Sequence, residues 1–280
     1  MKSAVGAALV VALMSTSGYA QSSYGSWNDL PDRFQIDAGY FRLSPTTKLK
    51  WNPGEGGGSD IDLEKDLGFD NVANTFWIDG TWHLGRRHQV KLAYTKLSRQ
   101  VFDYQIQRDL EWGGEVYNAG LSADSDVSTE LLGAYYRFAL VKDDRFEIGP
   151  ALGIGYIWLD ARIRARGTIT GPGGGTEERS LDEDVSQSSP TGAIGGYFSA
   201  WATERLRLDG DFLNIKVSFD EDEAAVTDWR VGAQYYLFRN VGLGVQYKLN
   251  RYSYDRGIAS RDLGGEITYK GFQVYLSFLL

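Results

Sequence analysis

The chain has 280 residues, a formal net charge of -8 at pH 7 and no cysteine. The acidic balance argues against nucleic acid as a partner, because phosphate binding needs a basic face. Without cysteine, neither a disulfide framework nor a lipid-modified N-terminal Cys is available. The 42% of hydrophobic residues are spread in alternation rather than in long blocks, which excludes a bundle of membrane-spanning helices.

The first 20 residues have the pattern of a secretory signal peptide. Lys2 precedes an apolar run from Ala4 to Met14, and small or polar residues follow up to Ala20. The apolar run is shorter than the about 20 residues that a membrane-spanning helix needs, so cleavage after Ala20 is expected. We therefore expect a short periplasmic segment over 21–32 and a single domain over 33–280.

From residue 33 onward the dominant period is two. In the segment 74–84, for example, apolar Phe76 and Trp82 share one face, while Asp79 and Thr81 share the other. Lipid-facing and lumen-facing residues alternate in this way along a transmembrane β-strand. The segment therefore predicts a strand with one face for lipid and one for water.

The same alternation predicts ten strands. They cover about 33–43, 74–84, 88–99, 127–139, 145–158, 189–201, 205–213, 228–237, 241–250 and 265–280. Short and long connections between them alternate strictly, as periplasmic turns and external loops do in outer-membrane barrels. The predicted fold is all-β, an antiparallel up-and-down transmembrane β-barrel with both ends in the periplasm. Twelve strands are an open alternative if Thr46–Trp51 and Ile61–Asp66 pair independently.

A soluble β-sandwich would also alternate apolar and polar residues. It would bury its apolar face, however, and would not need aromatic residues at both ends of that face. Here Trp82 and Phe138 lie at one end, and Trp158 and Trp229 lie at the other. Such aromatic girdles are typical of membrane barrels, so the sequence favours the barrel.

Several of the predicted strands continue past the lipid-facing stretch with their parity shifted. Two examples are Val101–Trp112 and Asp160–Ile169. A change of parity indicates a β-bulge, because one extra residue moves the following side chains to the other face. We therefore predict a bulge in each strand, and walls that rise above the membrane surface.

The last strand, Phe272–Leu280, resembles the C-terminal signal by which outer-membrane proteins are recognised for insertion. Such signals usually end in Phe, whereas this chain ends in Leu280. The expected partners are therefore the barrel-assembly machinery and periplasmic chaperones during insertion. Outer-membrane lipid and lipopolysaccharide are expected as partners afterwards.

Three segments resemble a family of proteobacterial outer-membrane β-barrel proteins of unassigned function with a porin-like barrel domain. They are Ile61–Gly68, Phe76–Gly80 and Arg87–Arg99, which match that family's loop, strand, Arg-His turn and next strand. The likeness extends more loosely to the C-terminus and departs at Lys65, where the family usually has an acidic residue. It implies a barrel in the outer membrane of a Gram-negative bacterium, and it adds nothing on chemistry.

Barrel enzymes of this size generally use a histidine near the outer face. The two histidines of this chain, His83 and His88, both flank the predicted periplasmic turn at Gly85. A general base for neutral pH is therefore missing from the outer face. The sequence predicts no catalytic residue, cofactor or metal site, and Lys65 stands where a calcium loop starting at Asp60 would require Gly.

The inward faces of the predicted strands carry charges of both signs. These residues are Asp79, Lys91, Arg137, Glu147, Arg207, Asp209, Asp211, Arg230 and Lys248. Mixed charge favours internal pairing, and a ten-stranded barrel should have a narrow or plugged lumen. The sequence predicts a narrow porin-like channel for small solutes. The alternative is a non-conducting barrel that presents acidic external loops.

The first external loop contains a candidate plug. Apolar Ile61, Leu63 and Leu67 are interspersed there with charged residues. The charged residues of this candidate plug are Asp60, Asp62, Glu64, Lys65 and Asp66. Leaving three large apolar groups in water is unfavourable, so the segment is expected to fold inward against the wall. The alternative is an extracellular hairpin paired with Thr46–Trp51.

Overall fold

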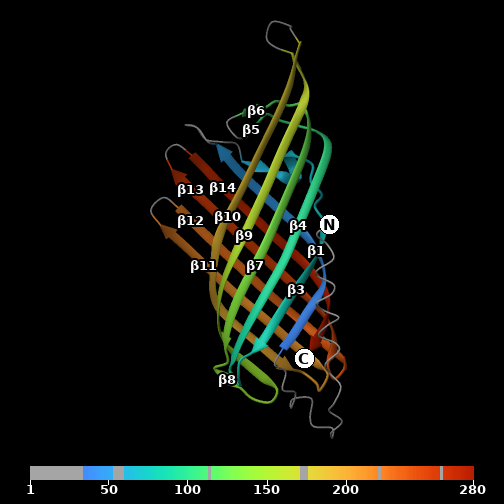
Figure 1. The fold of residues 1–280 in the computed structure, drawn as a ribbon, viewed down its shortest axis with the longest axis vertical. Coiled ribbons are helices and arrows are strands. Elements are labelled where there is room, and N and C mark those ends of the chain that lie inside the picture. Colours follow the sequence, from blue (N-terminus) through green and yellow to red (C-terminus); the bar gives the residue numbers. More distant parts are fainter. Residues whose placement is uncertain (1–33, 53–59, 113–114, 171–175, 220–221, 259–260) are drawn as a thin grey trace. The chain divides into compact units, whose positions relative to one another are not determined.

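The computed structural model describes residues 34–52, 60–112, 115–170, 176–219, 222–258 and 261–280, and both the predicted signal peptide and the segment 21–32 lie outside these ranges. The described residues form a ten-stranded antiparallel barrel (Figure 1). Its strands are β1 (Phe34–Asn52), β3 (Ala73–His83), β4 (His88–Gln105), β7 (Ser122–Phe138), β9 (Phe146–Thr170), β10 (Thr176–Trp201), β11 (Leu206–Phe219), β12 (Asp222–Phe238), β13 (Val241–Ile258) and β14 (Arg261–Leu279).

Each barrel strand pairs with its neighbours along the chain, and β14 pairs with β1 from Gln35↔Leu279 to Asn52↔Asp262, which closes the barrel. The ten predicted strands are confirmed, and several run further than predicted. The strand β9, for example, continues to Thr170 instead of ending at Trp158. Closure leaves no free edge within the paired region, which is the condition for a sheet to lie in lipid.

The twelve-strand alternative is wrong. Residues Thr46–Trp51 are the outer part of β1. The strand β2 (Ile61–Asp62) forms two pairs with β1 and is followed by one helical turn, α2 (Leu63–Asp66). The remaining short strands are a hairpin of β5 (Leu110–Trp112) and β6 (Glu115–Tyr117), and β8 (Val141–Lys142), which pairs with β9. No helix among the described residues is long and apolar enough to cross a membrane.

The outer surface of the lower half of the barrel, nearest the short turns, is an apolar belt. Phe76 and Ile154 on this surface are 77% and 72% exposed, whereas Trp77, next to Phe76, is 5% exposed. Stacked and edge-on aromatic pairs mark the belt, such as Phe34 with Trp82 and Tyr40 with Phe76. The belt matches the lipid-facing surface of a membrane barrel.

Above the belt the polarity of the wall is reversed. On β9, Ile163 is buried in the lumen while Arg162 and Arg164 face outward. The pairing of β9 with β7 and β10 shows no register shift, so the bulge predicted for β9 is wrong. The reversal has another cause: above the belt the outer face meets water, and the inner face packs on an apolar core.

The bulge predicted in β4 is confirmed. The register of β4 against β7 shifts between Val101 and Tyr104, and Asp103 between them has a φ of 56°. Asp tolerates this left-handed conformation better than most residues. The shift turns the upper part of β4 so that Tyr104 reaches the first external loop.

The four strands β4, β7, β9 and β10 form a taller wall than the others, and in Figure 1 the outer ends of β11–β14 diverge from β9 and β10. The ladder between β10 and β11 covers only Ile194↔Asn214 to Trp201↔Arg207. The ladder between β3 and β4 likewise ends at Trp77↔Thr95. The barrel therefore splits on two sides near the upper border of the belt.

Candidate functional site

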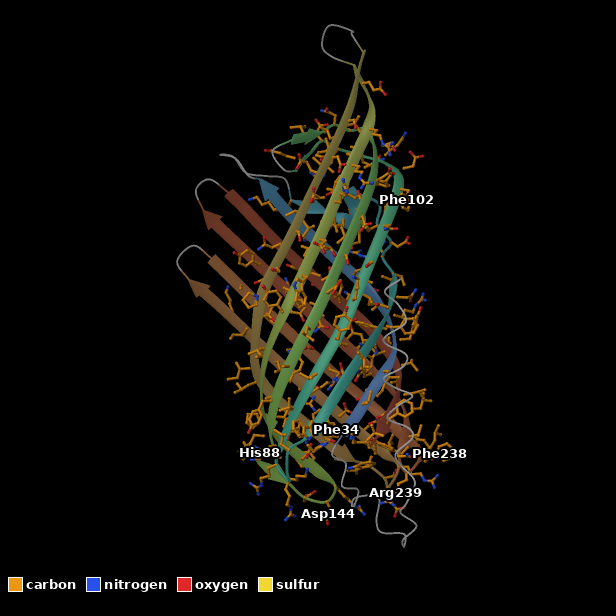
Figure 2. All side chains as sticks on the ribbon, in the orientation of Figure 1. Phe34, His88, Phe102, Asp144, Phe238 and Arg239 are labelled. Carbon is orange, nitrogen blue, oxygen red and sulfur yellow. The ribbon has the colours of Figure 1, made fainter. Side chains whose placement is uncertain are left out.

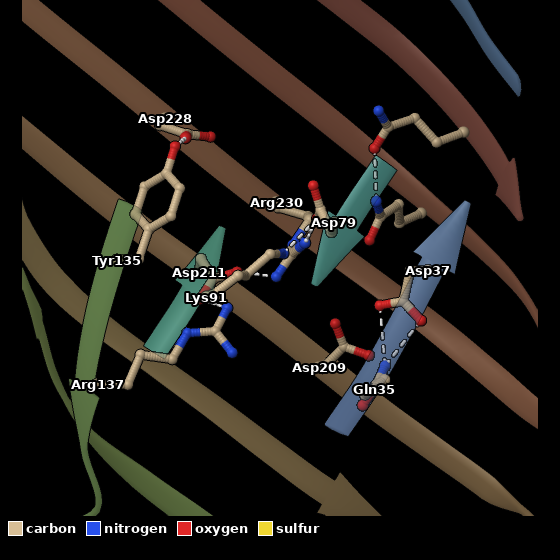
Figure 3. A network of polar contacts seen from close by, with 12 residues as sticks. Gln35, Asp37, Asp79, Lys91, Tyr135, Arg137, Asp209, Asp211, Asp228 and Arg230 are labelled. Carbon is tan, nitrogen blue, oxygen red and sulfur yellow. Dashed lines mark hydrogen bonds and ion pairs between the residues drawn. The ribbon is translucent and has the colours of Figure 1, made fainter. Parts of the chain in front are cut away.

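A network of ion pairs crosses the lumen at the level of the apolar belt. The carboxylate of Asp79 on β3 accepts from Lys91 Nζ at 2.5 Å and from Arg230 Nη1 at 2.9 Å. Arg230 also bonds to Asp211, and Arg137 Nη2 lies 2.5 Å from the same carboxyl group. Figure 3 shows the five side chains meeting from β3, β4, β7, β11 and β12. Strands far apart in the sequence are thus tied together across the lumen.

Register explains why these charges meet. Asp211 on β11 is directly opposite Arg230 on β12, and Arg230 is directly opposite Lys248 on β13. On the other side of the lumen Asp37 on β1 is opposite Asp79, a like-charged pair that is unfavourable by itself. The cations on Asp79 offset this repulsion.

Two further polar groups line the lumen above and below the network. On its upper side Tyr135 Oη donates to Asp228 Oδ2 at 2.7 Å. On its lower side Gln89 Nε2 donates to Glu147 Oε1 at 2.7 Å, and Lys142 Nζ lies 2.8 Å from Oε2 of the same residue. Polar side chains therefore line the lumen from the short turns to the upper part of the belt.

Another cluster lies beside β1. Arg207 Nη2 donates to Gln35 Oε1 at 3.0 Å and its Nε lies 4.0 Å from Asp209. Gln35 Nε2 in turn donates to both oxygens of Asp37 at 2.9 Å. Nearby, Gln246 donates to Gln273 at 2.5 Å. Polar side chains thus occupy the lumen next to the closing pair of strands.

The structure places the nine charged residues selected from the sequence on the inner face of the barrel. Asp79, Lys91, Asp211 and Arg230 are buried and meet in one network. Sequence reasoning missed Asp37, Asp228, Gln35 and Tyr135. They share the inward parity of their strands, so a complete count of inward positions would have found them.

The candidate plug folds into the upper lumen. Its apolar side chains join a buried core with the segment 106–121 and the tall wall. The larger members of that core are Leu49, Ile61, Leu63, Leu67, Phe69, Ile106, Leu110, Tyr117, Leu121 and Ile163. Of the alternative, an extracellular hairpin, only the two residue pairs between β2 and β1 are present. The rest of the segment lies inside the barrel.

One buried ion pair anchors the segment between β1 and β4. Glu64 Oε1 lies 2.5 Å from Arg99 Nη1, and Glu64 Oε2 accepts from the Thr47 amide at 2.9 Å. Arg99 also donates to the Thr47 hydroxyl at 2.6 Å and lies over the Phe69 ring. Gly68 next to Phe69 has a φ of 71° and packs directly on Tyr104, so a side chain there would collide with that ring.

The other charged residues of the segment lie nearer the surface. Asp62 caps α2 by accepting from the Lys65 amide at 3.2 Å, whereas the Lys65 side chain is 79% exposed and Asp60 is exposed. Asp66 Oδ2 accepts from Arg108 Nη2 at 2.6 Å. Burial by itself would raise the pKa of Asp66, but the hydrogen bonds from Arg108 and from the Asp62 amide outweigh it and hold this pKa below its ordinary value.

Both histidines lie near the short turns at the lower end. Figure 2 shows His88 at the same end as Asp144 and Arg239. His88 Nδ1 lies 2.6 Å from Tyr136 Oη on the outer surface, while His83 ends β3. Within the described ranges no three His, Cys, Asp or Glu side chains are grouped so that they could hold a metal ion.

Comparisons with known proteins found similar solved structures but no similar sequence. No family model matches the chain. No curated protein sequence matches it either. Among solved structures, the outer-membrane protease OmpT from Escherichia coli is similar with a TM-score of 0.55 at 14% identity, over 93% of this chain and 100% of that one. At this identity the likeness shows the barrel fold alone.

Two other solved barrels are more distantly similar. The translocator domain of the autotransporter NalP from Neisseria meningitidis has a TM-score of 0.40 at 10% identity, over 90% of each chain. A FadL homologue from Pseudomonas aeruginosa has a TM-score of 0.36 at 9% identity, over 90% of this chain and 91% of that one.

Proposed function

We propose that this chain is an integral protein of a Gram-negative outer membrane whose lumen is closed to freely diffusing solutes. The observation that carries the proposal is the buried ion network at the level of the apolar belt, in which Asp79, Asp211 and three cations meet across the lumen. The belt supports the location, because an apolar outer surface of this extent is stable only against lipid. Export by a signal peptide and contact with lipopolysaccharide are parts of the same proposal.

Two seals in series support a closed lumen. The cavities at the level of the network have volumes of about 40 Å³ each or less, enough for a few water molecules and too small for a solute. Above the network, the segment around Leu63 and Leu67 fills the upper lumen on the β1 and β4 side. A solute would have to displace both the ion pairs and the apolar core.

A narrow porin-like channel is the second candidate. It is favoured by the polar and charged side chains that line the lower lumen between the levels of Glu147 and Asp228. Arginine side chains such as Arg137 are long, so a rearrangement of the network would open a polar path without unfolding the wall. This candidate predicts conduction in bursts when the network rearranges.

Planar bilayer recording on the refolded protein separates the two candidates. For the closed barrel we expect a baseline without stable open levels at moderate voltage and salt. Regular, long-lived conductance steps in preparations that also show heat-modifiable migration would overturn the closed barrel and establish the channel. Liposome swelling with small sugars gives an independent readout that does not depend on charge.

A further inference from the structure

The upper lumen contains an apolar cavity of about 290 Å³ between β9 and β10 on one side and β11–β14 on the other, next to Leu49 of β1. Most of its lining is aliphatic or aromatic, including Leu49, Ile157, Val185, Ile215, Val226 and Tyr252. The polar lining residues are uncharged apart from Lys50, which has the outward parity of β1. We propose that this cavity binds a neutral apolar molecule of about the size of naphthalene.

The size and chemistry of the cavity select this class of ligand. A cavity of 150 Å³ lined by aliphatic and aromatic side chains stays dry and binds benzene, and this cavity has nearly twice that volume. Small-molecule sites are mostly apolar with a few polar groups for orientation, a part that Gln187, Ser189 and Thr191 can play here. A charged ligand would lose its hydration without gaining an ion partner.

The split between β10 and β11 lies beside the cavity, and we infer that the ligand enters there. Their ladder ends at Ile194↔Asn214, next to Phe212 of the apolar belt, and the cavity is lined by β10 residues above this point and by Ile215 of β11. Pro190 lies in this part of β10, and proline is confined to edge strands because it cannot donate to a second ladder. The entrance therefore lies at the border of the lipid, where apolar molecules accumulate.

The cavity is closed at its lower end, so that a ligand would be held there. Thr191, Val226 and Tyr252 also line the small cavity beneath, whose lining includes the charged residues Asp79, Asp228 and Lys248. Below that level the ion network fills the lumen. An apolar ligand is held above the charges, because moving further down would bring it against buried ionic groups.

Equilibrium dialysis with radiolabelled naphthalene tests the proposal. The full-length protein is placed in lipid nanodiscs, and empty nanodiscs of the same lipid give the partition into the membrane. We expect about one saturable equivalent of naphthalene per barrel above that background. We expect Ala224→Phe, which adds a ring inside the cavity, to weaken binding at least tenfold. Thr227→Phe, on the outer face of the same strand, should bind like the wild type.

The folding of each variant is checked by heat-modifiable migration, and Ile215→Phe on β11 replaces Ala224→Phe if the latter does not fold. Naphthalene uptake equal to that of empty nanodiscs would overturn the proposal, because it would be partition only. Full binding by the folded cavity variant would also overturn it. Conductance decides the closed-lumen proposal separately, because the dialysis does not depend on whether the barrel conducts.

Discussion

Single side chains show how strongly the two faces of the wall differ. Gly80 lies on the outer face of β3 within the apolar belt, opposite Ile36 and Leu92, and no atom lies within 4 Å of the place where its Cβ would stand. Gly80→Leu should therefore fold like the wild type. Gly80→Arg should cost about 2–4 kcal/mol, because it places a charge in the hydrocarbon region. Unfolding by urea in liposomes measures both, and equal stability would place this face away from lipid.

The buried pair of Glu64 and Arg99 makes a second residue-scale prediction. Removing one partner of a buried ion pair costs about 3–5 kcal/mol, because the other charge is left without compensation. Glu64→Ala should release the segment 60–69 and make it sensitive to protease in the folded barrel. Lys65→Ala is the matched control, because Lys65 is exposed. Equal protection in the two variants would show that the ion pair does not anchor the segment.

At the scale of elements, the segment 60–69 and the ion network are seals in series. Deleting Gly56–Asp66 alone should leave the conductance low, because the network below stays intact. Combining the deletion with Arg137→Ser and Asp211→Ser should raise the conductance, and these two changes are made together so that neither charge is left unpaired. Planar bilayer recording gives the comparison. A large conductance after the deletion alone would mean that the network is no barrier.

The ion pair between Asp66 and Arg108 gives the first external loop a pH dependence. Because the folded state lowers the pKa of Asp66 below its ordinary value of 3.8, its contribution to stability is fully present above about pH 3.8. The contribution is lost as the pH falls through the lower, folded value. Cleavage of the segment 60–69 by pepsin should therefore increase as the pH falls below about 3.8. In Asp66→Asn this part of the pH dependence should disappear, and an unchanged profile would exclude Asp66 as its origin.

At the scale of the whole molecule, the alternation of short turns and long loops predicts which end of the barrel faces the external medium. Ser180 on the upper part of β10 and Asp144 in a lower turn are both exposed. The chain has no cysteine, so Ser180→Cys and Asp144→Cys each introduce a single thiol. In intact Gram-negative cells a membrane-impermeant maleimide should label Ser180→Cys only. Asp144→Cys should react only after the outer membrane is permeabilised. The reverse labelling pattern would show that the barrel has the opposite orientation in the membrane.

Much of the barrel was predictable because its signals are local. The lipid selects every second residue along a strand, so segments such as 74–84 show their facing directly, and short turns such as 85–87 show the connectivity. The inward parity of Asp79, Arg137 and Arg230 is visible in the same way. For these features the sequence by itself is sufficient, because each one depends only on neighbours along the chain and on the contrast between lipid and water.

Tertiary structure alone decided which charges pair and what fills the upper lumen. Asp79 meets Arg230, 151 positions away, through strand register around a closed barrel, and no local pattern carries that information. The polarity reversal of β9 has the sequence signature of a bulge, but it arises because the segment around Leu63 and Leu67 supplies an apolar core to that side of the wall. The apolar cavity, likewise, is lined by residues of seven strands, from Leu49 on β1 to Ile267 on β14. Such features depend on contacts between distant segments, whose free energies the alternation along a single strand does not contain.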